Sequence, residues 1–235
     1  MGINFKYRSY QPELLDQESI PTQDLHQNLK ELDTINTLLG GHAVSVKGLK
    51  AILKDRTVTV TIADVGCGGG DNLREMALWL RKQGIQASLV GIDMKRDCID
   101  YAKSKCKDFP EISFIESDYR LVTQKFDIII CALFCHHLND AQFNHYLKWS
   151  KNQSNIGFVI NDLHRHFLAY YSIKYLTFLF SKSYLVKNDA PLSVHRGFVT
   201  YELKKYLEEA GLVNFSVRWI WAFRYLTIFQ HHGKV

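Results

Sequence analysis

The sequence predicts an α/β fold: a doubly wound, mostly parallel seven-stranded sheet with an N-terminal helical cap and a helical lid inserted after the fifth strand. Strand-like and helix-like segments alternate between residues 58 and 160. The strand-like segments are short, continuous apolar runs such as FDIIICAL (126–133), which is typical of parallel strands buried on both faces. A glycine-rich loop, ADVGCGGGD (63–71), follows the first of them. We therefore expect a ligand beyond the carboxyl ends of the strands.

Composition limits the class of protein. The chain has 235 residues, 46% hydrophobic and 23% charged, which suits one globular domain with a small appendage. The net charge of +5 is spread along the chain, so no nucleic-acid partner is expected. The five cysteines lack regular CxxC spacing, which argues against a disulfide framework and a metal site. The polar N-terminus and the absence of an eighteen-residue apolar stretch predict a cytoplasmic protein without a transmembrane segment.

Residues 1–55 are expected to form the N-terminal cap. The first twenty residues show little periodicity; they either close the ligand pocket or dock loosely as a tail. The leucine spacing from Thr22 to Leu39 predicts an amphipathic helix with Thr22 as N-cap and Gly40 and Gly41 as its stop. A second helix is expected over Val44–Leu53.

Residues 56–235 are expected to form the main domain. The lid insertion covers about residues 163–198, with an apolar segment at Phe167–Phe180 and then a loop over residues 181–198 that contains Pro191. The expected strands are 58–65, 88–92, 112–116, 126–133, 155–160, 213–221 and 224–230, and the expected helices are 72–82, 95–107, 140–150 and 201–210.

The glycine loop and two later carboxylates suggest a nucleoside ligand. The spacing Gly66-x-Gly68-x-Gly70 is tighter than the GxGxxG of dinucleotide folds, and no Lys-Ser or Lys-Thr follows it. Asp93 ends the second strand, where a carboxylate can accept hydrogen bonds from a ribose diol. Asp118 follows the third strand, within reach of an adenine amine, and Tyr119 beside it could lie against the purine. The alternatives are structural, because each aspartate could merely cap a turn or helix.

These motifs resemble those of the class I S-adenosylmethionine-dependent methyltransferases. The matching pieces are ADVGCGGGDNL, LVGIDMKRDCIDYA, FIESDY and FDIIICALFCHHLND, over roughly residues 58–162. The resemblance implies S-adenosylmethionine as cofactor. In that arrangement the methionine portion contacts Asp64 and the loop with Gly66, Cys67, Gly68 and Gly70, the ribose contacts Asp93 beside Met94, the adenine contacts Asp118 with Tyr119, and Leu133 and Phe134 line the sulfonium side.

The whole chain is also similar to bacterial small-molecule O-methyltransferases, through RSYQPELLD, NTLLGGH, NDLHRH and APLSVHRGF. A hydroxyl acceptor must lose a proton, and an imidazole can take it near neutral pH. His136 and His137 follow the fourth strand and are expected in the pocket wall. His164 follows the fifth strand and is the expected general base. Acceptor contacts are expected from His137, Asp162, Arg165, Tyr170, Tyr171, His195 and Arg196.

The segment Phe167–Phe180 has three interpretations: a helix packed on the body, a lid over a hydrophobic acceptor pocket, or an interfacial helix that makes transient membrane contact. The lid is preferred because the segment follows the fifth strand.

The predicted function is therefore O-methylation of a small, lipophilic, largely apolar or aromatic acceptor, and no oligomeric state is assigned. A non-catalytic cofactor-binding protein is one alternative. A nucleotide-cofactor oxidoreductase is disfavoured by the GxGxG spacing and Asp118. A nucleic-acid methyltransferase is disfavoured because the chain has neither a basic patch nor an NPPY-like tetrapeptide.

Overall fold

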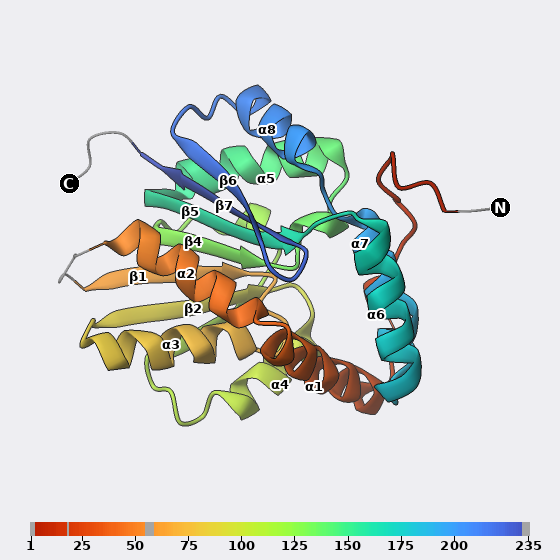
Figure 1. Cartoon of the computed structure of the whole chain (residues 1–235). Helices are drawn as coiled ribbons and strands as arrows, with labels where there is room; N and C mark the ends of the chain where they lie inside the picture. Colours follow the sequence, from red (N-terminus) through yellow and green to blue (C-terminus); the bar gives the residue numbers. More distant parts are fainter. Residues whose placement is uncertain (1–2, 18, 55–58, 232–235) are drawn as a thin grey trace.

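The computed structural model describes residues 3–17, 19–54 and 59–231, and its centre is a seven-stranded sheet of order β3-β2-β1-β4-β5-β7-β6 (Figure 1). The first five strands pair in parallel, and β7 runs antiparallel to both of its neighbours. The predicted α/β fold with a mostly parallel seven-stranded sheet is confirmed. The strands are β1 (Val60–Val65), β2 (Ala87–Asp93), β3 (Ile112–Glu116), β4 (Phe126–Ala132), β5 (Ser154–Leu163), β6 (Phe215–Ile220) and β7 (Arg224–Gln230).

Helices cover both faces of the sheet (Figure 1). On one face, α2 (Gly41–Leu53), α3 (Asp71–Gln83) and α4 (Arg96–Lys105) share a buried core with the strands. On the other, α5 (Asp140–Gln153) and α8 (Thr200–Glu209) pack over a second core. Two-sided burial explains why the central strands are apolar throughout, without the alternation of a half-exposed sheet.

The strand order reverses between β1 and β4, so the loops that follow these strands diverge and leave a crevice at the carboxyl edge. Helix α1 (Thr22–Leu38) covers this edge: Leu25 and Leu29 pack against Cys98 of α4. Helices α6 (Phe167–Phe180) and α7 (Tyr184–Arg196) stand side by side at the same end of the molecule (Figure 1).

Several local predictions were wrong. The loop expected over residues 181–198 is mostly helix α7; Pro191 lies inside it, and Ser183 caps it by accepting a hydrogen bond from the Val186 amide. Pro21, not Thr22, is the N-cap of α1. The second helix begins at Gly41, three residues before the predicted start, because Gly40 makes the turn with a φ of 71°.

Some predictions fall in part outside the described residues: residue 58 of the first predicted strand, the domain boundary at residues 55 and 56, and residues 1, 2, 18 and 232–235 of the two predicted domains. None of the described helices is long and apolar enough to cross a membrane.

Candidate active site

A cavity of about 700 Å³ lies at the carboxyl edge of the sheet, between the loops after β1, β2, β3 and β4 and the underside of α1. Most of the predicted cofactor residues line it, and His137 is the predicted acceptor residue that does so. The lining residues named from the sequence are Asp64, Gly66, Cys67, Gly68, Asp93, Met94, Asp118, Tyr119, Leu133, Phe134 and His137.

The glycine loop needs its glycines for two reasons. Gly66 has a φ of 71°, and a Cβ built on it would lie 2.6 Å from the Phe134 ring. Gly68 has a φ of 50°, and its amide donates to Asp93 Oδ2 at 3.0 Å. Gly70 does not line the cavity as predicted; it is the left-handed cap of α3, beside Cys106. The loop therefore turns at Gly70 and presents its first half to the ligand.

Asp64 is a buried carboxylate with one free oxygen. Its Oδ2 accepts a hydrogen bond from Asn72 Nδ2 at 3.1 Å, whereas Oδ1 has no partner in the described part of the chain. Burial, opposed by the Asn72 hydrogen bond and reinforced by the charges of Asp71 and Asp93, raises the pKa of Asp64 to about 8. An unpaired buried oxygen in a cavity wall requires a hydrogen-bond donor, and the ammonium group of S-adenosylmethionine would supply one when bound.

Asp93 and Asp118 lie at the tips of neighbouring strands. Asp93 Oδ1 accepts from the Lys95 amide at 2.9 Å, so this carboxylate joins the start of α4 to the glycine loop. Each oxygen keeps a lone pair for a ribose hydroxyl. Asp118 holds Arg120 in a bidentate pair, and this hydrogen bonding lowers the pKa of Asp118. The Tyr119 ring is held edge-on against Phe134 and further aromatic rings.

The opposite side of the cavity is more apolar and includes the N-terminal segment. Leu15 lines it together with Leu29 and Leu32 of α1. The segment is anchored, because the Leu14 and Leu15 amides donate to the Asp189 carboxylate at 2.8 and 2.9 Å. Of the two possibilities left open for the first twenty residues, the structure shows a docked segment that forms part of the cavity wall.

The predicted base, His164, lies outside the cavity lining. Its Nδ1 accepts a hydrogen bond from Trp219 Nε1 at 3.1 Å, and its ring stacks against Phe223. Burial and the neighbouring charges of His166 and Arg165 lower the pKa of His164 to about 4. His164 is therefore part of the packing around β6 and β7.

Strand alternation explains why Asp162, a predicted acceptor contact, is also absent from the cavity wall. Successive side chains of β5 point to opposite faces. Asn161 points toward α2, where it donates to Ser45 Oγ, and it lines the cavity. Asp162 points the other way and pairs with His136 Nδ1 at 2.7 Å. Neither Asp162 nor His136 is a lining residue.

The other predicted acceptor contacts are structural too. Arg165 pairs with Glu202 at 2.6 Å and is fully covered. Arg196 is buried and donates to the carbonyls of His136, His137 and Gln11. His195 contacts the Asn4 carbonyl, and the rings of Tyr170, Tyr171 and His195 surround Phe5. None of these predicted contacts lies in the cavity wall, because the N-terminal segment occupies the space beside them.

Several lining residues were not predicted from the sequence: Asp16, Asn36, His42, Asn161 and Arg224. Asp16, Asn36, His42 and Asn161 lie in the segments RSYQPELLD, NTLLGGH and NDLHRH, which carried the O-methyltransferase resemblance but assigned these residues no role. Arg224 is the first residue of a strand and lies in no motif. Two carboxylate–histidine groups, Glu13–His136–His137 and Asp33–His42–Asp71, are close enough to approach one ion. Arginines already pair with Glu13 and Asp33.

Comparison with known proteins agrees with this geometry. Residues 62–153 match the family described as a methyltransferase domain. A segment of 89 residues, 36% of this chain, is 35% identical to the mitochondrial ubiquinone biosynthesis O-methyltransferase of Saccharomyces cerevisiae. That segment spans only 27% of the yeast enzyme.

Two solved structures share the fold. A methyltransferase from Aquifex aeolicus that depends on S-adenosylmethionine superposes with a TM-score of 0.62 and 16% identity, over 90% of this chain and 99% of that one. Human N-acetylserotonin methyltransferase, in complex with S-adenosylmethionine, superposes with a TM-score of 0.67 and 15% identity, over 91% of this chain and 57% of that one. Residues 62–153 therefore match a methyltransferase domain, and the strand order and the cavity between β1 and β4 give the whole chain the fold of the class I S-adenosylmethionine-dependent methyltransferases, which supports S-adenosylmethionine as its cofactor.

Proposed function

We propose that the protein transfers the methyl group of S-adenosylmethionine to a hydroxyl of a small, largely apolar or aromatic acceptor. The observation that carries this proposal is a histidine–carboxylate pair in the cavity wall: His137 Nδ1 lies 2.9 Å from Asp16 Oδ1. Leu15, Leu29 and Leu32 give the adjoining wall its apolar character. The O-methyltransferase name of the yeast relative supports the same chemistry.

The pair is arranged to accept a proton. Burial alone would raise the pKa of Asp16, but the hydrogen bond and charge of His137, together with Arg196, bring it below its ordinary value. An ionised Asp16 accepts from Nδ1–H, which leaves the lone pair of the imidazole on Nε2. Because the cofactor supplies a methyl group already activated on sulfonium, the protein has to orient the hydroxyl, exclude water and remove one proton.

Glu13 offers a place for that proton. Its Oε2 lies 3.7 Å from His137 Nε2, and its side chain is buried. Burial, partly offset by His137, Ser193 and Arg196, raises the pKa of Glu13 to about 7. As the hydroxyl oxygen takes up the methyl group that the bound cofactor would supply, its proton would pass to His137 Nε2 and then to Glu13.

The test is turnover with a panel of phenols and lipophilic hydroxy acids, measured as formation of S-adenosylhomocysteine. His137→Gln should lower kcat by about 100- to 10,000-fold while leaving the Kd of S-adenosylhomocysteine within about twofold. His164→Gln is the matched control, because His164 lies outside the cavity, and its kcat should not change. Unchanged kcat in His137→Gln would contradict the proposal. Cofactor binding without turnover of any hydroxyl acceptor would favour the non-catalytic alternative.

A further inference from the structure

Arg224 is a buried cation in the cavity wall. Its side chain is only 3% exposed, and among the described residues no carboxylate forms an ion pair with it. Its contacts are two neutral amides: Nη2 donates to Asn36 Oδ1 at 2.8 Å, and Nη1 lies 3.4 Å from Asn161 Oδ1. The other buried arginines differ, since Arg8, Arg165 and Arg196 each have a carboxylate partner.

The surrounding residues hold Arg224 in place. Asn161 Nδ2 donates to the Gly41 carbonyl and to Ser45 Oγ, both at 2.9 Å, which turns its Oδ1 toward the guanidinium. A Cβ on Gly41 would lie 2.7 Å from Arg224 Nη2, so the glycine leaves room for the cation. Burial lowers the pKa of Arg224 to about 10, with the charge of Asp162 acting in the opposite direction, and the group stays cationic at neutral pH.

An unpaired buried charge is costly unless a ligand pairs with it. We propose that Arg224, positioned by Asn36 and Asn161, binds a carboxylate group inside the cavity. A guanidinium fork binds a carboxylate through two parallel hydrogen bonds. Asp64 supplies a carboxyl group with an unpaired oxygen to the same cavity, and this group would ionise beside a bound ammonium, so the two together complement a zwitterion. The carboxylate belongs either to the methionine portion of the cofactor or to the acceptor, in which case the inference rests on the proposed function.

Calorimetry with the wild-type protein and its variants distinguishes these sources. If the cofactor supplies the carboxylate, Arg224→Met should raise the Kd of S-adenosylhomocysteine about 10- to 100-fold. The Kd of 5′-methylthioadenosine, which lacks the amino-acid portion, should stay unchanged. If the acceptor supplies the carboxylate, Arg224→Met should bind S-adenosylhomocysteine as the wild type does. Wild-type protein saturated with S-adenosylhomocysteine should then bind benzoate but not benzamide, and Arg224→Met should lose benzoate binding.

Asn36→Asp tests the same inference if Arg224→Met fails to fold. It places a carboxylate beside the guanidinium, and so should weaken binding of the same ligand while raising the Tm. Arg81→Met, which removes an exposed arginine outside the cavity, is the matched control. Unchanged Kd values for S-adenosylhomocysteine and benzoate in both cavity variants would overturn the inference and leave the proposed O-methylation standing. Failure of the wild-type protein to bind S-adenosylhomocysteine would instead contradict the cofactor assignment.

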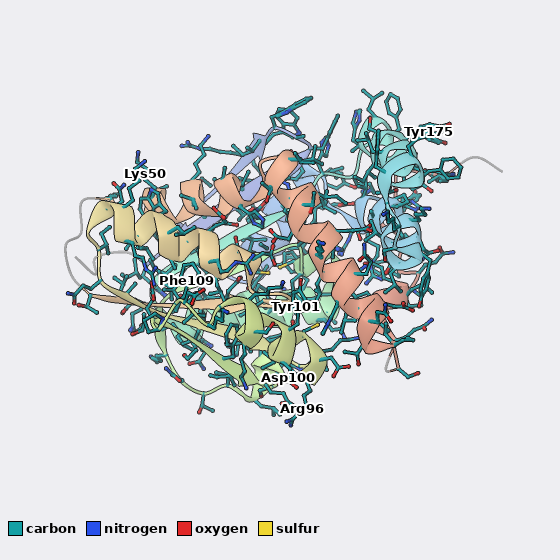
Figure 2. All side chains as sticks on the ribbon, turned by 90° about the horizontal axis from the view of Figure 1, so that it is seen from below. Lys50, Arg96, Asp100, Tyr101, Phe109 and Tyr175 are labelled. Carbon is teal, nitrogen blue, oxygen red and sulfur yellow. The ribbon has the colours of Figure 1, made fainter. Side chains whose placement is uncertain are left out.

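A second, independent observation concerns α6. Of its fourteen residues only Ala169 and Thr177 are buried, and its large apolar side chains face outward. Stacked rings of His166 and Phe223 connect the helix to Trp221 at the β6–β7 turn. Figure 2 shows Tyr175 at the outer edge of the molecule. We call this the aromatic surface: Phe167, Leu168, Tyr171, Tyr175, Leu176, Phe178, Leu179, Phe180 and Trp221, each at least 39% exposed.

The charged side chains of the segment that carries the aromatic surface are basic, and the nearby Glu31 of α1 is already bonded to Ser181 and to the Lys182 amide. Lys174, Lys182 and Lys187 are exposed, and residues 163–188 contain no aspartate or glutamate. Helix α6 does not line the cavity, so the lid interpretation stays a prediction. We infer that the aromatic surface docks on an anionic lipid bilayer: exposed aromatic rings enter the interface, and lysines pair with headgroups.

Cosedimentation with phosphatidylcholine vesicles, with and without about 30% of the anionic lipid phosphatidylglycerol, tests this inference. Wild-type protein should pellet with the anionic vesicles, and Phe178→Glu with Leu179→Glu should reduce binding at least about tenfold. Val213→Glu, an exposed apolar position elsewhere, is the control and should bind like wild type. Equal binding by all three proteins, or a wild-type dimer that the double variant dissociates without any vesicle binding, would overturn it.

Discussion

Replacing Asp64 by asparagine should stabilise the ligand-free protein and weaken cofactor binding. The carboxyl has a pKa of about 8 in the folded chain and 3.8 as its ordinary value. At pH 7 the unfolded chain is ionised at this position and the folded chain holds a proton. Each pKa unit corresponds to about 1.4 kcal/mol, so the folded state loses up to about 4 kcal/mol at pH 7. Asparagine keeps the hydrogen bond from Asn72 and removes this penalty.

The sign follows from the raised pKa. Below pH 3.8 both states hold the proton and Asp64 costs nothing; the penalty grows as the pH rises toward 8 and is constant above it. Urea denaturation should therefore show that Asp64→Asn raises the free energy of unfolding more at pH 8 than at pH 5. At pH 7 the increase should be about 1–4 kcal/mol.

Calorimetry should show the opposite effect on the ligand. Asp64→Asn should raise the Kd of S-adenosylhomocysteine about 10- to 100-fold, because a charge-assisted hydrogen bond to the ammonium is lost. Asp100→Asn, at an exposed carboxyl on α4, is the control. A stability difference independent of pH between 5 and 8, or an unaltered Kd, would refute the assignment of Asp64.

Three further outcomes are expected. Gly66→Ala should lower the free energy of unfolding by about 1–3 kcal/mol, as measured by urea denaturation, because its Cβ would meet Phe134 at 2.6 Å; unchanged stability would contradict this. Arg165→Met should destabilise the protein by about 3–5 kcal/mol, because Glu202 loses its ion-pair partner. The KM for the acceptor should be unchanged in the folded protein, and an altered KM would show that Arg165 contacts the acceptor. Tyr170→Ala with Tyr171→Ala should likewise leave the acceptor KM within about twofold, since neither ring lines the cavity.

The cavity residues at the strand ends could be predicted because their signals are local. The glycines from 66 to 70 and the aspartates at positions 93 and 118 follow strand-like runs, and parallel strands bring their carboxyl ends to one edge whatever the details of packing. Even here one assignment failed. Gly70 has the backbone conformation expected of a loop glycine, but the turn uses it to begin α3.

Acceptor residues could not be predicted in the same way. The choice between Asn161 and Asp162 depends on strand register, because one residue of shift exchanges the two faces of the sheet. Pro191 lies in a segment that the sequence predicts as a loop, yet α7 tolerates it, and Asp189 of the same helix anchors the N-terminal segment. Asp16 and Arg224 come from opposite ends of the chain, and only folding brings them to one cavity.

The sequence by itself determined the class I fold and its methyl donor, since strand–helix alternation and a glycine loop are encoded within a few consecutive residues. Tertiary structure alone decided which side chains face the cavity. It paired Asp162, Arg165 and Arg196 with their partners, left Asp64 and Arg224 without ion-pair partners among the described residues, and exposed α6. Burial and pairing depend on residues distant in the chain, and these set whether a charged group stabilises the fold or binds a ligand.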